Sequence, residues 1–163
     1  MAVPKRDTFR LVSDYQAVNS QVEQSPGVMP HQEDMRELLG AKCFGKLDFL
    51  QGYWQMPLAP EAQEVFTIVT PDGLLTPTRV PQGVLKATSY FQGVMTDLLR
   101  GLDCKVWVDD VFYFAEDEIY FLCLLDEIFV RLESVGLFVA AHKCTFFGRE
   151  LVCLLYTSPS PRD

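Results

Sequence analysis

The chain has 163 residues, of which 48% are hydrophobic and 22% are charged, and its formal net charge is −8. This length and hydrophobic fraction are typical of one folded domain and exclude intrinsic disorder for most of the chain. No apolar run approaches the roughly 18–20 residues that span a bilayer, and no apolar stretch follows the first charges as in a signal peptide. We therefore expect an intracellular, cytoplasmic protein with no membrane partner, in which the five cysteines are reduced thiols.

The spacing of apolar residues changes between two and about 3.6, which predicts an α+β domain. Its first half is expected to form a strand, a helix, a second strand and a hairpin, over 8–12, 30–39, 43–49 and 64–80. The helix follows Pro30 and stops at Gly40. The hairpin is expected because Pro71-Asp72-Gly73, a typical turn sequence, lies between two β-prone runs.

The second half is expected to begin with a helix over 85–99, followed by two strands within 105–115 that meet at Asp109-Asp110. A last helix is expected to start at Asp117 and to end at Gly136. Its apolar face is predicted from Ile119, Leu122, Leu125, Ile128, Phe129 and Leu132. Short strands follow. We expect the folded domain to cover 1–155 and residues 156–163, which are polar and rich in proline, to be a disordered tail of foreign origin.

The two adjacent carboxylates Asp109 and Asp110 are the most informative feature, because strongly β-prone residues lie on both sides of them. An unpaired carboxylate inside a sheet is costly, so the pair is expected at a hairpin turn. An ordinary turn is the alternative interpretation, since aspartate is common in turns.

A third carboxylate, Asp48, ends the expected strand 43–49. If this strand lies beside the 105–115 hairpin, Asp48 and Asp109 face each other at one edge of the sheet. Two or three carboxylates with open positions suit Mg²⁺, which keeps its remaining sites for water and phosphates. The sequence contains no phosphate-binding glycine loop, no nucleophile elbow and no zinc-ligand spacing.

From residue 3 to 147 the chain resembles the fingers and palm of a reverse transcriptase, and it is most similar to the polymerases of gypsy-type LTR retrotransposons. Several short blocks carry this resemblance in the order and spacing of that family. The blocks are Lys5-Arg6-Asp7 with Arg10, Asp14-Tyr15 with Asn19, Leu47-Asp48, Gly52-Tyr53-Trp54-Gln55, Pro81-Gln82-Gly83, Phe91-Gln92, Val108-Asp109-Asp110 and His142-Lys143-Cys144.

The resemblance implies a polymerase palm, a ferredoxin-like antiparallel sheet with helices on one face, together with part of the fingers. It implies an RNA-directed DNA polymerase that adds deoxynucleotides to a primer on an RNA or DNA template. The thumb and RNase H segments of such polyproteins are expected to be absent, which predicts weak binding of primer and template.

The resemblance also implies a role for each matched residue. Asp48, Asp109 and Asp110 would be the catalytic residues and the ligands of two Mg²⁺ ions. The other five would bind the incoming nucleotide: Lys5 and Arg10 at the triphosphate, Tyr53 under the sugar, where it excludes a 2′-hydroxyl, and Gln82 and Gly83 in the nucleotide pocket.

Two alternatives remain at this stage. The first is a catalytically inert, truncated retroelement remnant that binds nucleic acid weakly or not at all. The second is an RNA-templated RNA polymerase, which Tyr53 disfavours because such enzymes must accept a 2′-hydroxyl.

Overall fold

The computed structural model describes residues 2–5, 8–11, 13–22 and 41–149, and for the first two ranges it describes the backbone alone. The helix expected over 30–39 and the tail 156–163 lie outside the described residues. The elements are β1 (Ala2–Lys5), β2 (Thr8–Leu11), α1 (Gln16–Asn19), β3 (Cys43–Asp48), α2 (Gly52–Gln55), α3 (Pro60–Gln63), η2 (Glu64–Phe66), β4 (Ile68–Thr70), β5 (Gly73–Leu75), α4 (Ala87–Leu98), β6 (Cys104–Trp107), β7 (Asp110–Ala115), α5 (Glu118–Ser134), η3 (Ala141–Lys143) and β8 (Thr145–Gly148).

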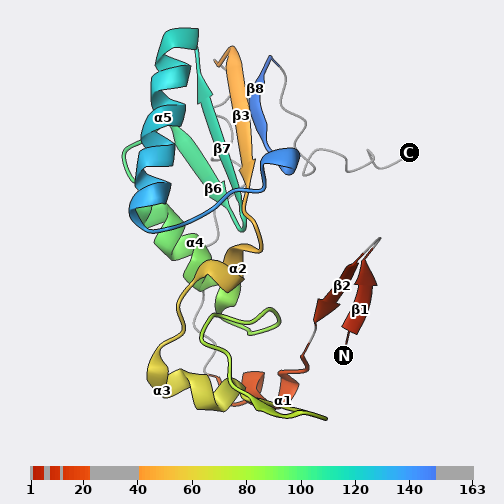
Figure 1. Ribbon diagram of the computed structural model, residues 1–163. Coiled ribbons are helices and arrows are strands. Elements are labelled where there is room, and N and C mark those ends of the chain that lie inside the picture. Colours follow the sequence, from red (N-terminus) through yellow and green to blue (C-terminus); the bar gives the residue numbers. More distant parts are fainter. Residues whose placement is uncertain (1, 6–7, 12, 23–40, 150–163) are drawn as a thin grey trace, which may run out of the picture.

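The central unit is a four-stranded antiparallel sheet with the strand order β6-β7-β3-β8 (Figure 1). Along the chain its elements follow as β3, α4, β6, β7, α5 and β8. This order of strands and helices is that of a ferredoxin-like fold, so the expected palm architecture is confirmed. The hairpins β1-β2 and β4-β5 form separate two-stranded sheets.

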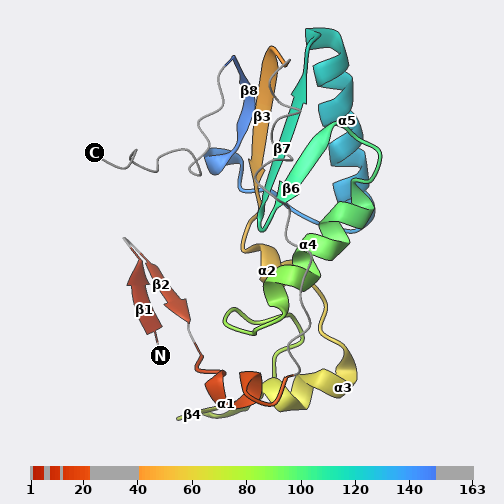
Figure 2. The ribbon, with the colours of Figure 1, turned by 180° about the vertical axis from the view of Figure 1, so that it is seen from behind.

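Helices α4 and α5 cover one face of this sheet, as the opposite views in Figures 1 and 2 show. Alternate residues of β3 point into the core: Cys43, Gly45 and Leu47 are buried, whereas Phe44, Lys46 and Asp48 are only partly buried. From the helices, Phe91 and Met95 of α4 and Ile128 of α5 join the same core. The other face of β3 is therefore free to carry polar groups.

The register of β3 and β7 decides what lies on that second face. Asp48 pairs with Asp110, and Lys46 pairs with Phe112. Directly opposite residues of an antiparallel pair share a face, so both carboxylates lie on the face away from the helices. The expected contact between strand 43–49 and the 105–115 hairpin is thus confirmed, but Asp110 rather than Asp109 stands opposite Asp48.

The hairpin expected over 64–80 is present but much shorter. Its turn lies at Pro71-Asp72, as expected, and only 68–70 and 73–75 form strands. The preceding residues form the short helices α3 and η2 because Pro60 starts a helical turn. After the hairpin, Arg79 forms an isolated bridge with Pro57.

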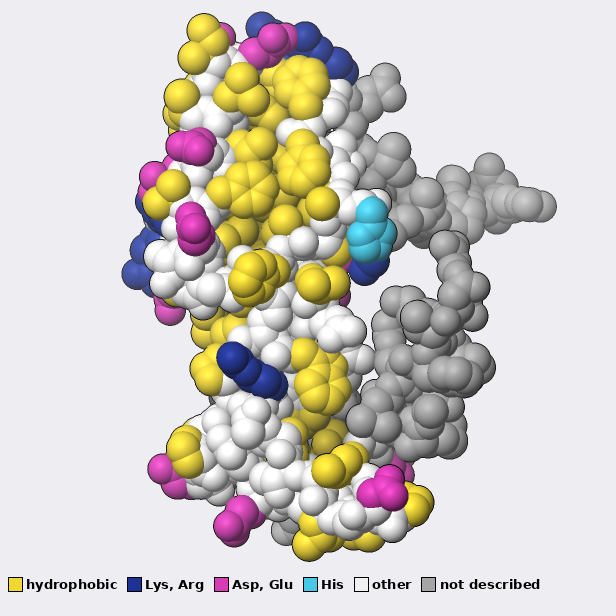
Figure 3. All heavy atoms as spheres, in the orientation of Figure 1, with side chains coloured by type: hydrophobic (Ala, Val, Ile, Leu, Met, Phe, Trp, Pro, Cys, Tyr) yellow, Lys and Arg dark blue, Asp and Glu magenta, His cyan; other side chains and the backbone are white. Residues whose placement is uncertain are grey.

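Helix α5 starts at the expected cap, where the Asp117 carboxylate accepts a hydrogen bond from the Tyr120 N–H, but its predicted apolar face is partly wrong. Ile119 and Leu122 are 74% and 59% exposed, whereas Phe121 and Leu124 are buried beside Ile128 and Leu132. Apolar residues occupy more than one face of this helix, so spacing alone does not select the buried one. Figure 3 shows hydrophobic side chains gathered on the surface over α5 and β8.

Within the described residues, none of the helices has the length and apolar character that a membrane span requires. The four cysteines in this part of the chain are unpaired thiols.

Candidate active site

Three carboxylates lie where β3 ends and β7 begins. Asp48 is the last residue of β3, Asp110 is the first residue of β7, and the two are directly paired. Asp109 lies in the turn that joins β6 to β7 and is exposed to solvent. Short β strands that end together thus bring all three predicted acidic residues to one end of the sheet.

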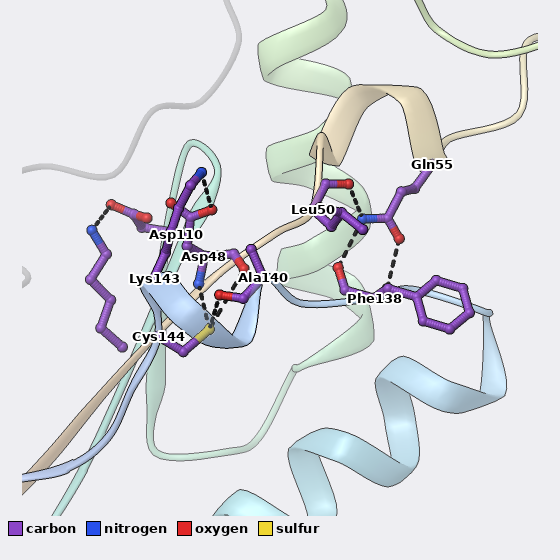
Figure 4. Close-up of polar contacts among 9 residues, drawn as sticks. Asp48, Leu50, Gln55, Asp110, Phe138, Ala140, Lys143 and Cys144 are labelled. Carbon is purple, nitrogen blue, oxygen red and sulfur yellow. Dashed lines mark hydrogen bonds and ion pairs between the residues drawn. The ribbon is translucent and has the colours of Figure 1, made fainter. Parts of the chain in front are cut away.

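Each of the two strand carboxylates forms an ion pair with a lysine. Lys46 Nζ lies 2.6 Å from Asp110 Oδ2, and Lys143 Nζ lies 3.0 Å from Asp48 Oδ1 (Figure 4). Lys46 precedes Asp48 by two residues, so it shares the face of both carboxylates. The period of two in the strand could have identified Lys46 from the sequence, whereas the contact of Lys143 depends on the fold.

The pKa of Asp110 reflects the charged groups around it. Burial raises the pKa of Asp110, the hydrogen bond and charge of Lys46 lower it, and the negative charges of Asp109 and Asp48 raise it further. The three acids are therefore close enough to interact electrostatically. Among the described residues, however, no three carboxylate, thiol or imidazole groups converge closely enough to hold a metal ion.

The donor set at this end of the sheet fits Mg²⁺ in its chemistry. Asp48, Asp109 and Asp110 offer only carboxylate oxygens, which are the ligands that this hard cation prefers. Lys46 and Lys143 now neutralise two of these carboxylates. A bound cation would take over that role and release the two ammonium groups.

The backbone of Asp48 is fixed by the segment that follows α5. The Ala140 N–H donates to the Asp48 carbonyl oxygen at 2.8 Å, and the Asp48 N–H donates to Cys144 Sγ at 3.4 Å. The Cys144 thiol also lies 3.4 Å from the Ala140 carbonyl oxygen (Figure 4). Two residues of the block His142-Lys143-Cys144 thus hold Asp48: Cys144 binds its backbone N–H, and Lys143 pairs with its carboxylate.

Tyr53 lies on α2, shortly after Asp48, and is partly buried. Its hydroxyl lies 3.3 Å from Thr88 Oγ1, and its ring meets the edge of Phe91 at 5.7 Å between centroids. Gln55 holds the same segment in place, because its amide makes hydrogen bonds of 2.6–2.8 Å with both backbone groups of Phe138 (Figure 4). Tyr53 is therefore a rigidly positioned aromatic side chain with a described partner on α4.

Gln82 and Gly83 lie in the loop before α4, where Gly83 adopts a φ of 93°. A Cβ at Gly83 would meet only ordinary contacts, so this positive φ is the reason for glycine here. Asn19 fixes the loop: its amide donates to the Gly83 carbonyl oxygen at 2.8 Å and accepts from the Leu85 N–H at 2.9 Å. Sequence reasoning placed Asn19 in a family block but gave it no role.

Lys5 and Arg10 lie on the separate β1-β2 hairpin. Lys5 pairs with Thr8, and Arg10 pairs with Val3. The backbone alone is described there, so a role for these two side chains at a triphosphate stays a prediction.

Comparison with known proteins shows which family the chain resembles. The family described as "Reverse transcriptase (RNA-dependent DNA polymerase)" matches residues 3–156. The Retrovirus-related Pol polyprotein from transposon gypsy of Drosophila melanogaster is 33% identical over 142 residues, which are 85% of this chain and 14% of that protein. The chain spans between 12% and 22% of the length of the curated relatives that it matches.

Solved structures share the fold. The foamy viral protease-reverse transcriptase in complex with double-stranded DNA superposes with a TM-score of 0.85 at 28% identity, over 94% of this chain and 28% of that one. The same enzyme in complex with an RNA/DNA hybrid gives a TM-score of 0.80 at 29% identity, over 88% of this chain and 20% of that one.

Proposed function

The chain belongs to the reverse transcriptase (RNA-dependent DNA polymerase) family, and from this premise we propose that residues 1–155 are its fingers and palm and carry out nucleotidyl transfer. The proposed reaction adds a deoxynucleotide to a primer 3′-hydroxyl on an RNA or DNA template. Structural relatives bound to double-stranded DNA and to an RNA/DNA hybrid support these substrates.

One observation carries the proposal: Asp48 stands opposite Asp110 across β3 and β7, and Asp109 lies in the adjoining turn. These three carboxylates carry more negative charge than Lys46 and Lys143 neutralise. We propose that these residues hold two Mg²⁺ ions. When bound, two such ions activate an attacking hydroxyl and stabilise a leaving phosphate oxygen.

The chain's own residues supply positioning and charge. Asp48 is held by the backbone of Ala140 and by Cys144, so its carboxylate reaches the site from a fixed strand end. Lys46 and Lys143 form ion pairs with the same carboxylates, and with Mg²⁺ bound there their ammonium groups would be free to contact phosphate oxygens.

We propose that Tyr53 selects the sugar. A ring held by Thr88 and Phe91 cannot retreat easily from a 2′-hydroxyl, so it favours deoxynucleotides by contact. Gln82 and Gly83 would line the base and sugar, in a loop that Asn19 keeps in shape. Lys5 and Arg10 would bind the triphosphate. The sequence block that contains them resembles that of the family, and charged lysine and arginine side chains form strong hydrogen bonds with phosphate.

Primer extension tests this proposal. The assay contains an RNA template, a DNA primer, the four deoxynucleotides and Mg²⁺, with the wild-type chain beside Asp109→Asn and Asp72→Asn. Asp72 lies in the exposed turn of the β4-β5 hairpin, so it controls for the loss of one negative charge. We expect extension by the wild type and by Asp72→Asn, and a loss of about a hundredfold or more in Asp109→Asn.

Two results would contradict the proposal. If Asp109→Asn extends the primer as fast as the wild type, the Asp109 carboxylate is not needed for the reaction. A folded wild-type chain that makes no product would instead favour the inert remnant.

A further inference from the structure

The turn between β6 and β7 has an unusual backbone. Of the described residues other than glycine, only Gln51 and Val108 have a positive φ, and that of Val108 is 57°. Trp107 pairs with Asp110, so Val108 and Asp109 form a two-residue hairpin loop. Such loops require a positive φ at the first position, where glycine is preferred. A β-branched residue is strained there and persists only if its surroundings hold it.

Gln92 supplies that hold. This α4 residue is 4% exposed, and among the described residues it is the one buried side chain that is not aliphatic, aromatic or sulfur-containing. Its Nε2 donates to the Val106 carbonyl oxygen at 2.9 Å, and its Oε1 accepts from the Val108 N–H at 2.7 Å. The amide thus binds the backbone on both sides of Trp107.

The position of β6 explains why an amide is needed. This strand lies at the edge of the sheet, with β7 as its single neighbour, so half of its backbone groups have no strand to bind. Like a backbone peptide, a primary amide offers an N–H donor and a C=O acceptor, and it has a second N–H that can bind another partner. Gln92 therefore takes the place of a neighbouring strand at Val106 of β6 and at Val108, the first residue of the turn.

We propose that Gln92 is a positioning residue for Asp109: its amide holds Val108 in the strained conformation that directs the Asp109 carboxylate toward Asp48 and Asp110. This inference rests on the proposed function, since it assigns the same site a supporting residue on α4. A metal ligand must be held close to its productive geometry by neighbours that are themselves fixed. Without the amide, the turn can relax and Asp109 moves away from the other two acids.

The test compares Gln92→Met with Thr96→Val. Methionine keeps the length and volume of Gln92 but makes neither backbone hydrogen bond. Thr96→Val removes the third partner of the Gln92 amide, the hydroxyl 3.2 Å from Nε2, and leaves the bonds to Val106 and Val108 in place. Circular dichroism establishes that each variant is folded.

The first readout is Mn²⁺ binding, followed by electron paramagnetic resonance in the presence of a deoxynucleoside triphosphate. We expect Gln92→Met to bind Mn²⁺ about tenfold or more weakly, the range seen when a supporting group is removed from a metal ligand, and Thr96→Val to match the wild type. In primer extension, Gln92→Met should lower kcat by a similar factor and change the KM for the nucleotide much less. Equal Mn²⁺ affinity in Gln92→Met and the wild type would overturn the proposal.

A second measurement needs no variant. Hydrogen exchange of the wild-type chain should show a Val108 amide that exchanges as slowly as amides of the sheet interior. If it exchanges as fast as an exposed loop amide, the Gln92 bond is not maintained and the positioning role is refuted, even if Gln92→Met does not fold. If the wild type binds Mn²⁺ but makes no DNA, the proposed function is contradicted. The positioning role of Gln92 is then still decided by the Mn²⁺ affinities and by hydrogen exchange at Val108.

Discussion

Gly45 offers the sharpest test of the packing that supports the site. It lies on β3 directly opposite Tyr113 of β7, and the tyrosine ring covers it. A Cβ at this position would lie 2.0 Å from Tyr113 Cζ and 2.3 Å from its hydroxyl oxygen. Carbon atoms in contact stay about 3.5–4.0 Å apart, so Gly45→Ala must displace the ring or the strand.

The cost follows from what the ring does. Tyr113 is 1% exposed, stacks on Phe121 at 5.0 Å between centroids, and donates a hydrogen bond to the Phe146 carbonyl oxygen at 2.9 Å. Overpacking a core costs about 1–3 kcal/mol, a lost hydrogen bond about 1 kcal/mol, and a disturbed aromatic pair about 1 kcal/mol. We therefore expect Gly45→Ala to lower the free energy of unfolding by about 4 kcal/mol, roughly a thousandfold in the equilibrium constant.

Urea denaturation followed by tryptophan fluorescence measures this change. Gly93→Ala is the matched control, because a Cβ on that exposed residue of α4 would meet no heavy atom within 4 Å. Alanine favours a helix over glycine, so Gly93→Ala should raise stability by about 0.5–1 kcal/mol. The reasoning would be refuted if Gly45→Ala were as stable as the wild type.

Three further predictions concern separate parts of the chain. Tyr53→Ala should reduce discrimination against ribonucleotides in primer extension by roughly tenfold or more; unchanged discrimination would refute the steric role. Burial raises the pKa of Cys104 to about 11, so at about pH 8 it is thiolate in roughly one molecule per thousand. Mass spectrometry should find that iodoacetamide modifies the exposed Cys123 first, with the rate at Cys104 rising about tenfold per pH unit up to the raised pKa; equal rates would contradict this. Asp117→Ala should cost about 1 kcal/mol in urea denaturation by removing the cap of α5, whereas Asp126→Ala, an exposed residue within the same helix, should cost much less.

The sequence predicted the strands at the site well, because their signal is local. The run 43–48 alternates between buried and partly buried residues, whereas 110–115 is a β-prone run that is almost wholly buried. Both strands lie within the ranges expected from the sequence, 43–49 and 105–115. The pairing register does not follow from the pattern alone. A shift of one position separates the expected Asp48–Asp109 pair from the observed Asp48–Asp110 pair, and the length of the turn at Val108 decides it.

The supporting residues could not be predicted because they act across the fold. Lys143 reaches Asp48 from a position 95 residues later in the chain, and Gln92 binds an edge strand that follows its own helix. Neither contact has a signature in residue spacing. The buried face of α5 was missed for a different reason: several apolar faces are possible on that helix, and packing against β7 selects the one with Phe121 and Leu124.

Direct metal binding tests the central claim, that Asp48, Asp109 and Asp110 jointly hold divalent cations. Electron paramagnetic resonance would count the Mn²⁺ ions bound by the wild type, Asp109→Asn and Asp72→Asn in the presence of primer, template and a deoxynucleotide. Our account predicts two bound ions in the wild type and in Asp72→Asn, as expected of a two-metal site, and a loss of at least one in Asp109→Asn. Identical binding by all three proteins would contradict it.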